Sequence, residues 1–196
     1  MIKYDELNNE LINAGLSCGE FMNEKMNPVE TLVNTKLSAK PFRLILLKYI
    51  HSLFGKELEM VIRALSEKDM KEVSSKIIKL YNKENESKNL DLWTLGNALS
   101  IIDDKSTYKD IIKICRNSEF GRSRQMLMQT LRKINTEEAF EILLDSLKDK
   151  TIRGHAIEEL GKWGDKRALP LIEALEVKKG LYEAKAKKKV IKKLKQ

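Results

Sequence analysis

Residues 152–175 decide the fold, and they read IRGHAIEELGKWGDKRALPLIEAL. Apolar side chains recur every three or four positions on both sides of Gly164 and Asp165, which is the pattern of two amphipathic helices joined by a short turn. The carboxylate of Asp165 can accept hydrogen bonds from the free N–H groups at the start of the second helix. Pro170 lies near that start, where a missing N–H costs little. The stretch therefore predicts a helix-turn-helix unit whose apolar stripes need a neighbouring unit to cover them.

The same order of helix, polar turn and helix, which we call the repeat frame, recurs earlier in the chain. Leu99, Leu131 and Leu160 are each followed three residues later by a large apolar residue, then by a polar turn and a second apolar run. These leucines lie 32 and 29 residues apart. Two-helix units with a period of about 30 to 45 residues are typical of α-solenoids. We therefore predict an all-α fold, an α-solenoid of stacked antiparallel helix pairs, in which Leu131 and Leu160 are buried between units.

Residues 152–175 also resemble a HEAT repeat of the short, phycobilisome-lyase type that is found in bacterial HEAT-repeat proteins. The match lies in the apolar-Arg start, the Ala and Leu-Gly of the first helix, and the Gly-Asp-x-Arg-Ala turn with its following Pro and Ala-Leu. The preceding unit, residues 123–147, keeps the apolar frame but lacks the Gly-Asp turn. The resemblance covers residues 90–194 and implies a HEAT-like superhelix. We expect Arg153 to lie near an acid of its own or the preceding unit, such as Asp149 or Asp165.

We predict one α-solenoid domain over residues 1–196. Residues 90–196 form the recognisable HEAT-like repeats, closed by a capping helix at 181–194, and residues 1–89 form divergent helical repeats. The polar run at 82–89, NKENESKN, predicts a long loop or an internal boundary. No sustained two-residue alternation is present, so we predict no sheet.

The positive charge of the chain is concentrated at its end. The net charge is +8, and residues 178–196 hold nine lysines and one acid, Glu183. Residues 1–177 therefore hold 28 basic and 28 acidic residues. We expect the lysines to form a solvated face of the capping helix, while Leu181, Ala184, Val190, Ile191 and Leu194 close the last repeat. Attraction to a polyanion is the alternative.

Motifs for catalysis are scarce, and we expect no enzyme activity, cofactor or metal. The two histidines, His51 and His155, have no nucleophile beside them in the repeat frame. Cys18 and Cys115 lie far apart, which indicates reduced, buried thiols. The start of the chain carries acids where a signal peptide has bases, and no apolar run approaches the ~20 residues of a membrane span. We expect a cytoplasmic protein without membrane contact. Bilin-lyase activity is not expected, because nothing singles out a cysteine that would bind a tetrapyrrole.

Aligning the repeats by their spacing gathers a set of residues suited to binding a partner. Five first-helix positions lie near one edge of the array, where tryptophan and arginine beside amides form plausible hot spots: Trp93, Asn97, Arg124, Gln125 and His155. Packing between repeats is the alternative role for all five. Second-helix positions, with two charged residues near them, predict a groove of mixed charge, which suits a protein better than a phosphate backbone: Lys109, Lys113, Glu141 and Asp145, with Arg116 and Glu173 nearby.

The predicted function is a non-enzymatic HEAT-repeat scaffold that binds another protein through its solenoid surface. The alternative is a nucleic-acid-binding protein related to the HEAT-like alkylpurine DNA glycosylases. Those enzymes use a basic concave face with aromatic residues and an acid over the lesion. Here Trp93 and Trp163 are present, but residues 1–177 carry no net positive charge and no acid can be matched to either tryptophan.

Overall fold

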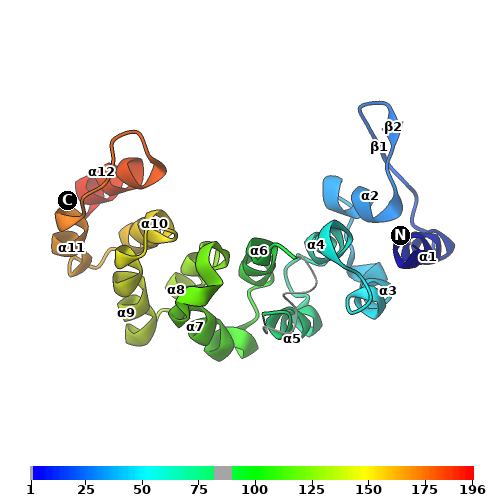
Figure 1. Cartoon of the computed structure of the whole chain (residues 1–196), viewed down its shortest axis with the longest axis horizontal. Coiled ribbons are helices and arrows are strands. Elements are labelled where there is room, and N and C mark those ends of the chain that lie inside the picture. The colour runs from blue at the N-terminus through cyan, green and yellow to red at the C-terminus, as the bar shows by residue number, and fades with distance from the viewer. Residues whose placement is uncertain (1, 82–89) are drawn as a thin grey trace. The chain divides into compact units, whose positions relative to one another are not determined.

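A computed structural model describes residues 2–81 and 90–196, and nearly all of their regular secondary structure is helical (Figure 1). The predicted all-α fold is confirmed. The polar run at 82–89, predicted as a loop or boundary, lies outside the described residues. Within the described part of the chain, none of the helices combines the length and apolarity needed to cross a membrane.

Contacts divide the chain into two compact units, unit 1 (Met1–Asp104) and unit 2 (Lys105–Gln196). The division follows Asp104 and not the polar run at 82–89. Unit 1 holds α1 (Ile2–Asn13), β1 (Glu20–Phe21), β2 (Glu24–Lys25), α2 (Pro28–Asn34), α3 (Arg43–Tyr49), α4 (Gly55–Ala64), α5 (Lys71–Lys79) and α6 (Leu92–Ile102). Unit 2 holds α7 (Tyr108–Arg116), α8 (Leu127–Ile134), α9 (Glu137–Asp145), α10 (Arg153–Trp163), α11 (Ala168–Ala174) and α12 (Tyr182–Leu194). Short 3-10 turns lie at Lys40–Phe42, Lys105–Thr107, Ser118–Arg124 and Ser146–Lys148.

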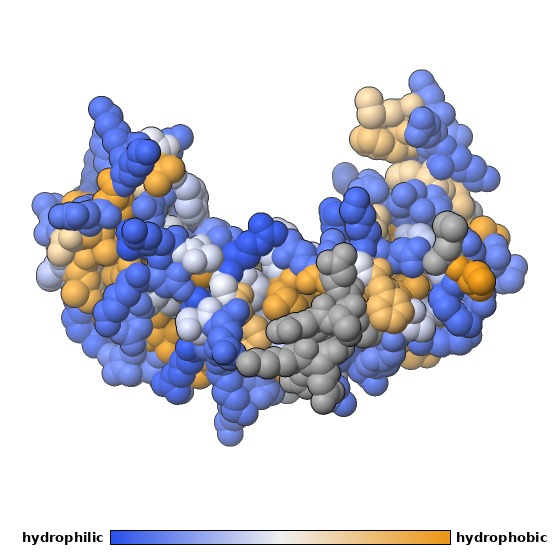
Figure 2. Space-filling model, viewed as in Figure 1, coloured by the Kyte–Doolittle hydropathy of each residue, from blue (hydrophilic) through white to orange (hydrophobic). Residues whose placement is uncertain are grey.

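The expectation of no sheet is wrong at one short place. β1 and β2 form an antiparallel hairpin in which Phe21 pairs with Glu24. The turn residues Met22 and Asn23 both have positive φ, 52° and 65°, as a two-residue hairpin turn of the primed type requires. Strands of two residues are too short to produce a detectable alternation. Phe21 and Met22 are exposed. Figure 2 shows an apolar patch at the tip of this hairpin.

Helices that are two apart in the chain pack on each other within unit 1. α4 contacts both α2 and α6, and α1 contacts α3, while α1–α2 and α5–α6 are contacts between neighbours. The core contains fully buried leucines and isoleucines, including Leu7, Leu11, Leu46, Ile50 and Leu58. The entry to α2 is a capping box in which Asn27 and Glu30 each satisfy the other's backbone N–H.

Unit 2 shows the same alternation. α10 contacts both α8 and α12, α7 contacts α9, and α8 contacts its neighbours α7 and α9. Leu131 and Leu160 are fully buried, as predicted. Alternating contacts of this kind are what stacked helix pairs produce. The single solenoid over residues 1–196 remains a prediction.

The repeat frame has a local structural counterpart in the ends of three helices. The residues directly after α6, α8 and α10 are Asp103, Asn135 and Gly164, which cap the ends of these helices. All three lie in the left-handed region, with φ of 56°, 55° and 87°. Their backbone N–H groups donate to the carbonyls of Leu99, Leu131 and Leu160 respectively. These residues keep the 32- and 29-residue spacing of the leucines. Asn and Asp tolerate the left-handed conformation best after Gly, so the units without the Gly-Asp turn still end their first helix in the same way.

Candidate functional site

The five predicted partner-binding residues are divided between the two units. Trp93 and Asn97 are half-buried on α6 of unit 1, where the Asp91 carboxylate accepts a 3.0 Å hydrogen bond from the Trp93 backbone N–H and caps the helix. Arg124, Gln125 and His155 belong to unit 2. Whether these five residues bind a partner remains a prediction, but the structure shows what three of them do within unit 2.

Arg124 is engaged inside the protein. Its side chain is only 5% exposed, and its guanidinium forms an ion pair with Asp149. Nη1 donates to the Cys115 carbonyl at 3.2 Å, and Nε donates to the Gly121 carbonyl at 3.3 Å. Burial raises the pKa of Asp149, but the hydrogen bonds from Thr151 and Arg124 outweigh it, so the net pKa is lowered. Arg124 thus ties the end of α7 to the turn after α9, as the packing alternative expected.

The sequence predicted that Arg153, the other buried arginine, is held near a turn acid such as Asp149 or Asp165, but its side chain has other partners. Arg153 Nε donates to the Leu147 carbonyl at 2.8 Å, and Nη1 lies 3.8 Å from the Glu183 carboxylate. Asp149 accepts from Arg124 instead. Asp149 therefore binds an arginine of the preceding repeat and not Arg153.

Gln125 and His155 do come together. Both line a recess of about 250 Å³, which we call the His155 recess, with Gln129, Glu158 and Tyr182 among its other lining residues. Gln125 Nε2 donates to the Thr151 carbonyl at 2.8 Å, and the His155 ring lies 5.3 Å from the Tyr182 ring, centroid to centroid. Burial lowers the pKa of His155, because it disfavours the charged imidazolium.

Three lining residues of the His155 recess were not predicted, namely Gln129, Glu158 and Tyr182. The repeat spacing could have identified the first two but not Tyr182. Gln129 and Glu158 occupy the repeat positions equivalent to Asn97, so the stacked frame already pointed to them. Tyr182 belongs to α12 and reaches the recess only because α12 packs on α10. Periodicity within α12 does not reveal that contact.

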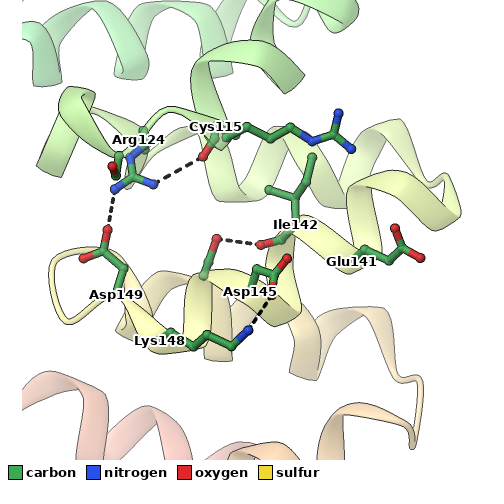
Figure 3. A pocket seen from close by; sticks show the side chains of 10 residues that line it. Cys115, Arg124, Glu141, Ile142, Asp145, Lys148 and Asp149 are labelled. Atoms are coloured by element: carbon green, nitrogen blue, oxygen red, sulfur yellow. Dashed lines mark hydrogen bonds and ion pairs between the residues drawn. The ribbon is translucent and has the colours of Figure 1, made fainter.

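A larger depression lies between α7 and α9 (Figure 3), and we call it the α7–α9 groove. Its volume is about 450 Å³, and buried Cys115 and Ile142 are its apolar lining residues. Charged side chains of both signs surround them, three basic and three acidic: Arg116, Arg124, Lys148, Glu141, Asp145 and Asp149. The sequence predicted a groove of mixed charge from six residues. Three of them line this groove, Arg116, Glu141 and Asp145, and the other three do not, Lys109, Lys113 and Glu173.

The charges of the α7–α9 groove differ in how they are compensated. Asp145 pairs with Lys148 at 2.8 Å, and both side chains are largely exposed, at 74% and 82%. Arg116 pairs with Glu138 at 2.9 Å. Among the described residues, Glu141 has no ion-pair partner, and Figure 3 draws it without one. The exposed pairs are weak, at about 0–1 kcal/mol each, so a partner can replace them at little cost.

The groove contains one potential nucleophile, the Cys115 thiol. Burial raises its pKa to about 12, and the positive charge of Arg124 only partly opposes this. A protonated thiol is a poor nucleophile at neutral pH. Among the described residues, no three histidine, cysteine, aspartate or glutamate side chains cluster as metal ligands would.

Comparison with protein-family models, with curated proteins and with solved structures found no match to this chain. The resemblance to HEAT repeats therefore rests on residues 152–175 and on the repeat frame alone.

Proposed function

We propose that this chain is a non-enzymatic helical-repeat scaffold, of HEAT-like architecture, that binds a segment of another protein in the α7–α9 groove. One observation carries the proposal: the groove combines an apolar floor with exposed charges of both signs. Interfaces between proteins have apolar centres and polar rims. A volume of about 450 Å³ suits a few side chains of a partner rather than a whole domain.

The balance of charge supports a protein partner over a phosphate backbone at this place. Three acids line the groove beside three bases, so a run of phosphates would find no net positive charge there and would meet repulsion at Glu141. A polypeptide segment with charges of both signs would find complementary groups. We prefer this groove to the edge predicted from Trp93 and Arg124, because the Arg124 guanidinium is already engaged internally.

We propose a binding role without catalysis, in the cytoplasm. The Cys115 thiol is buried and protonated, and the carboxylates of Asp145 and Asp149 are held by Lys148 and Arg124. Both cysteines, Cys18 and Cys115, are free, as is typical of a reducing compartment.

Photocrosslinking from single positions tests the groove. A benzophenone amino acid replaces Glu141 in the groove, and the matched control replaces Glu176, another exposed glutamate of unit 2 outside it. We expect one protein to crosslink from position 141 but not from 176, with or without nuclease treatment. Equal crosslinking from both positions, or loss of the product with nuclease, would contradict the proposal.

Charge reversal gives the second arm of that experiment. The double variant Glu141→Lys with Asp145→Lys should lose the crosslinked partner while its melting temperature stays close to that of the wild type, since both side chains are exposed. Glu176→Lys is the control. A partner retained by the double variant would place the binding surface elsewhere.

A further inference from the structure

α12 presents five exposed lysines on one face, Lys185, Lys188, Lys189, Lys192 and Lys193, which we call the α12 lysine face. At 100° per residue these lysines span an arc of about 140° and rise about 12 Å along the helix. The opposite face buries Ala186, Val190 and Leu194, and α12 packs on α10 and α11. The capping helix therefore separates its apolar stripe from its charge.

Two other lysines near the α12 lysine face have structural roles. Lys187 Nζ donates to the carbonyls of Glu173 and Leu175, at 2.8 and 2.6 Å, where α11 ends. Lys195 pairs with the Glu173 carboxylate at 2.7 Å. In contrast, the five lysines of the face have no hydrogen bond or ion pair among the described residues. Capping the last repeat accounts for the first two lysines and not for the other five.

Most of the acids near this face already pair with other basic side chains. On α10, Glu159 pairs with Arg132 at 2.7 Å, whereas Glu158 hydrogen-bonds Tyr182, which carries no positive charge. Glu173 on α11 holds Lys195, and Glu183 on α12 lies 3.8 Å from Arg153. Glu158 therefore offsets part of the positive charge of the α12 lysine face, and the rest is left for solvent or a ligand.

The charge imbalance extends to the whole of unit 2. This unit holds 23 basic and 13 acidic residues, whereas unit 1 holds 14 basic and 16 acidic residues. Lys189 and Lys193 also line, with Lys162 of α10, a groove of about 380 Å³ between α10 and α12. Glu158, Gly161 and Val190 complete its lining, and Val190 packs where a side chain at position 161 would lie.

We propose that the α12 lysine face binds the phosphate backbone of double-stranded nucleic acid, without reading its sequence. Lysine ammonium groups contact phosphates as point charges, whereas base recognition relies mainly on arginine, asparagine and glutamine. Residues 183–196 contain neither arginine nor an aromatic side chain. Single strands are held by stacking on aromatic residues, and the face lacks such a platform.

A membrane surface fits this face less well than a duplex does. Amphipathic helices bind membranes by burying an apolar face among the lipids. The apolar face of α12 is buried in the protein, with Val190 only 4% exposed. Apart from Tyr182 at its first position, the exposed side chains of α12 are all lysines.

The number of lysines sets the expected salt dependence. If each neutralises one phosphate, the slope of log K against log salt approaches about −4.5 on B-DNA. The affinity should then fall about 500-fold between ~50 and ~200 mM salt. This binding is independent of the α7–α9 groove, so its failure would leave the proposed function intact.

Fluorescence anisotropy with the full chain and a labelled DNA duplex of random sequence tests the proposal. We expect binding at low salt with the slope given above. The variant with all five lysines changed to Gln should lose most of that slope, and each single change, such as Lys189→Gln, should reduce it by about 0.9. Because the five side chains are exposed, the melting temperatures should change little.

A charge-matched control separates the α12 lysine face from net charge. It changes five exposed lysines of unit 1 to Gln: Lys36, Lys40, Lys56, Lys68 and Lys71. We expect it to keep the slope of the wild type. Equal losses in the two variants, or no duplex binding by the wild type at low salt, would overturn the proposal. Equally tight binding to polyglutamate or to phosphatidylserine vesicles would also overturn it, because it would show no preference for a duplex.

Discussion

Replacing Gly161 by alanine should force α10 and α12 apart. A Cβ built at position 161 would lie 2.4 Å from Cγ2 of Val190 and 2.9 Å from its Cγ1. Real Cβ atoms essentially never come closer than 3.0 Å to such neighbours. Valine in a helix holds one χ1 rotamer about nine times in ten, so Val190 has little freedom to turn away. The helices themselves must move.

The expected cost is the difference between two effects. Overpacking in a tight interior costs about 1–3 kcal/mol, and contact with both methyl groups of Val190 places this site near the upper end. Alanine is a better helix former than glycine by about 1 kcal/mol. We therefore expect Gly161→Ala to lower the free energy of unfolding by about 2 kcal/mol.

The double variant Gly161→Ala with Val190→Ala tests the cause. Val190→Ala alone removes two buried carbon atoms, at about 2 kcal/mol including the remaining cavity. The new methyl group at position 161 should occupy part of that space. The double variant should then lose no more than Val190→Ala alone, whereas additivity predicts about 4 kcal/mol. The coupling of about 2 kcal/mol lies within the range for contacting residues.

Urea unfolding followed by the helical circular dichroism signal measures these differences, and Gly164→Ala is the matched control. Gly164 has φ of +87° and no atom within 4 Å of a built Cβ, so alanine there is strained but meets no neighbour. Its loss, about 1–2 kcal/mol, should add to that of Val190→Ala without coupling. A neutral or stabilising Gly161→Ala, or an additive double variant, would refute the contact between α10 and α12 as described.

Three further predictions concern the core and the titrating groups of unit 2. Leu160 is fully buried, so Leu160→Ala should cost about 2–5 kcal/mol; an unchanged thermal midpoint would contradict the repeat frame. Burial raises the pKa of Cys115 to about 12, so iodoacetamide at neutral pH should label half-buried Cys18 in the folded protein and label Cys115 only after unfolding, as peptide mass spectrometry would show. The pKa of Asp149 is lowered from 3.8, so this group stabilises the fold above about pH 4 and the stabilisation disappears as the pH falls through its folded pKa. The difference in melting temperature between wild type and Asp149→Asn should therefore be largest near neutral pH and shrink in acid, and a constant difference would argue against the pair with Arg124.

The repeat frame was predictable because it depends on local chemistry. Leu99, Leu131 and Leu160 were identified from spacing, and the structure places a left-handed residue four positions after each of them. Helix periodicity and turn preferences depend on residues within about one repeat of each other, so they can be recognised in the sequence. The capping helix expected at 181–194 is α12 for the same reason.

The candidate site was only partly predictable. Glu141 and Asp145 line one groove with Arg116, because positions four apart share a face of α9, but Lys109 and Lys113, their predicted stacking partners, do not line it. Arg124 and Gln125 are adjacent in the chain but line different depressions. Their division depends on the 3-10 turn that precedes α8, which the spacing of apolar residues does not reveal.

The sequence by itself determined the helical class, the positions of the turns and the excess of lysine at the end of the chain, because these follow from residues close to one another. Only the tertiary structure decided which lysines are used in capping α11, which acid holds Arg124, and why position 161 is glycine. Each of these depends on the approach of segments about 10 to 30 residues apart. The distance and angle of that approach are set by the packing of whole helices, and the periodicity within one helix does not predict them.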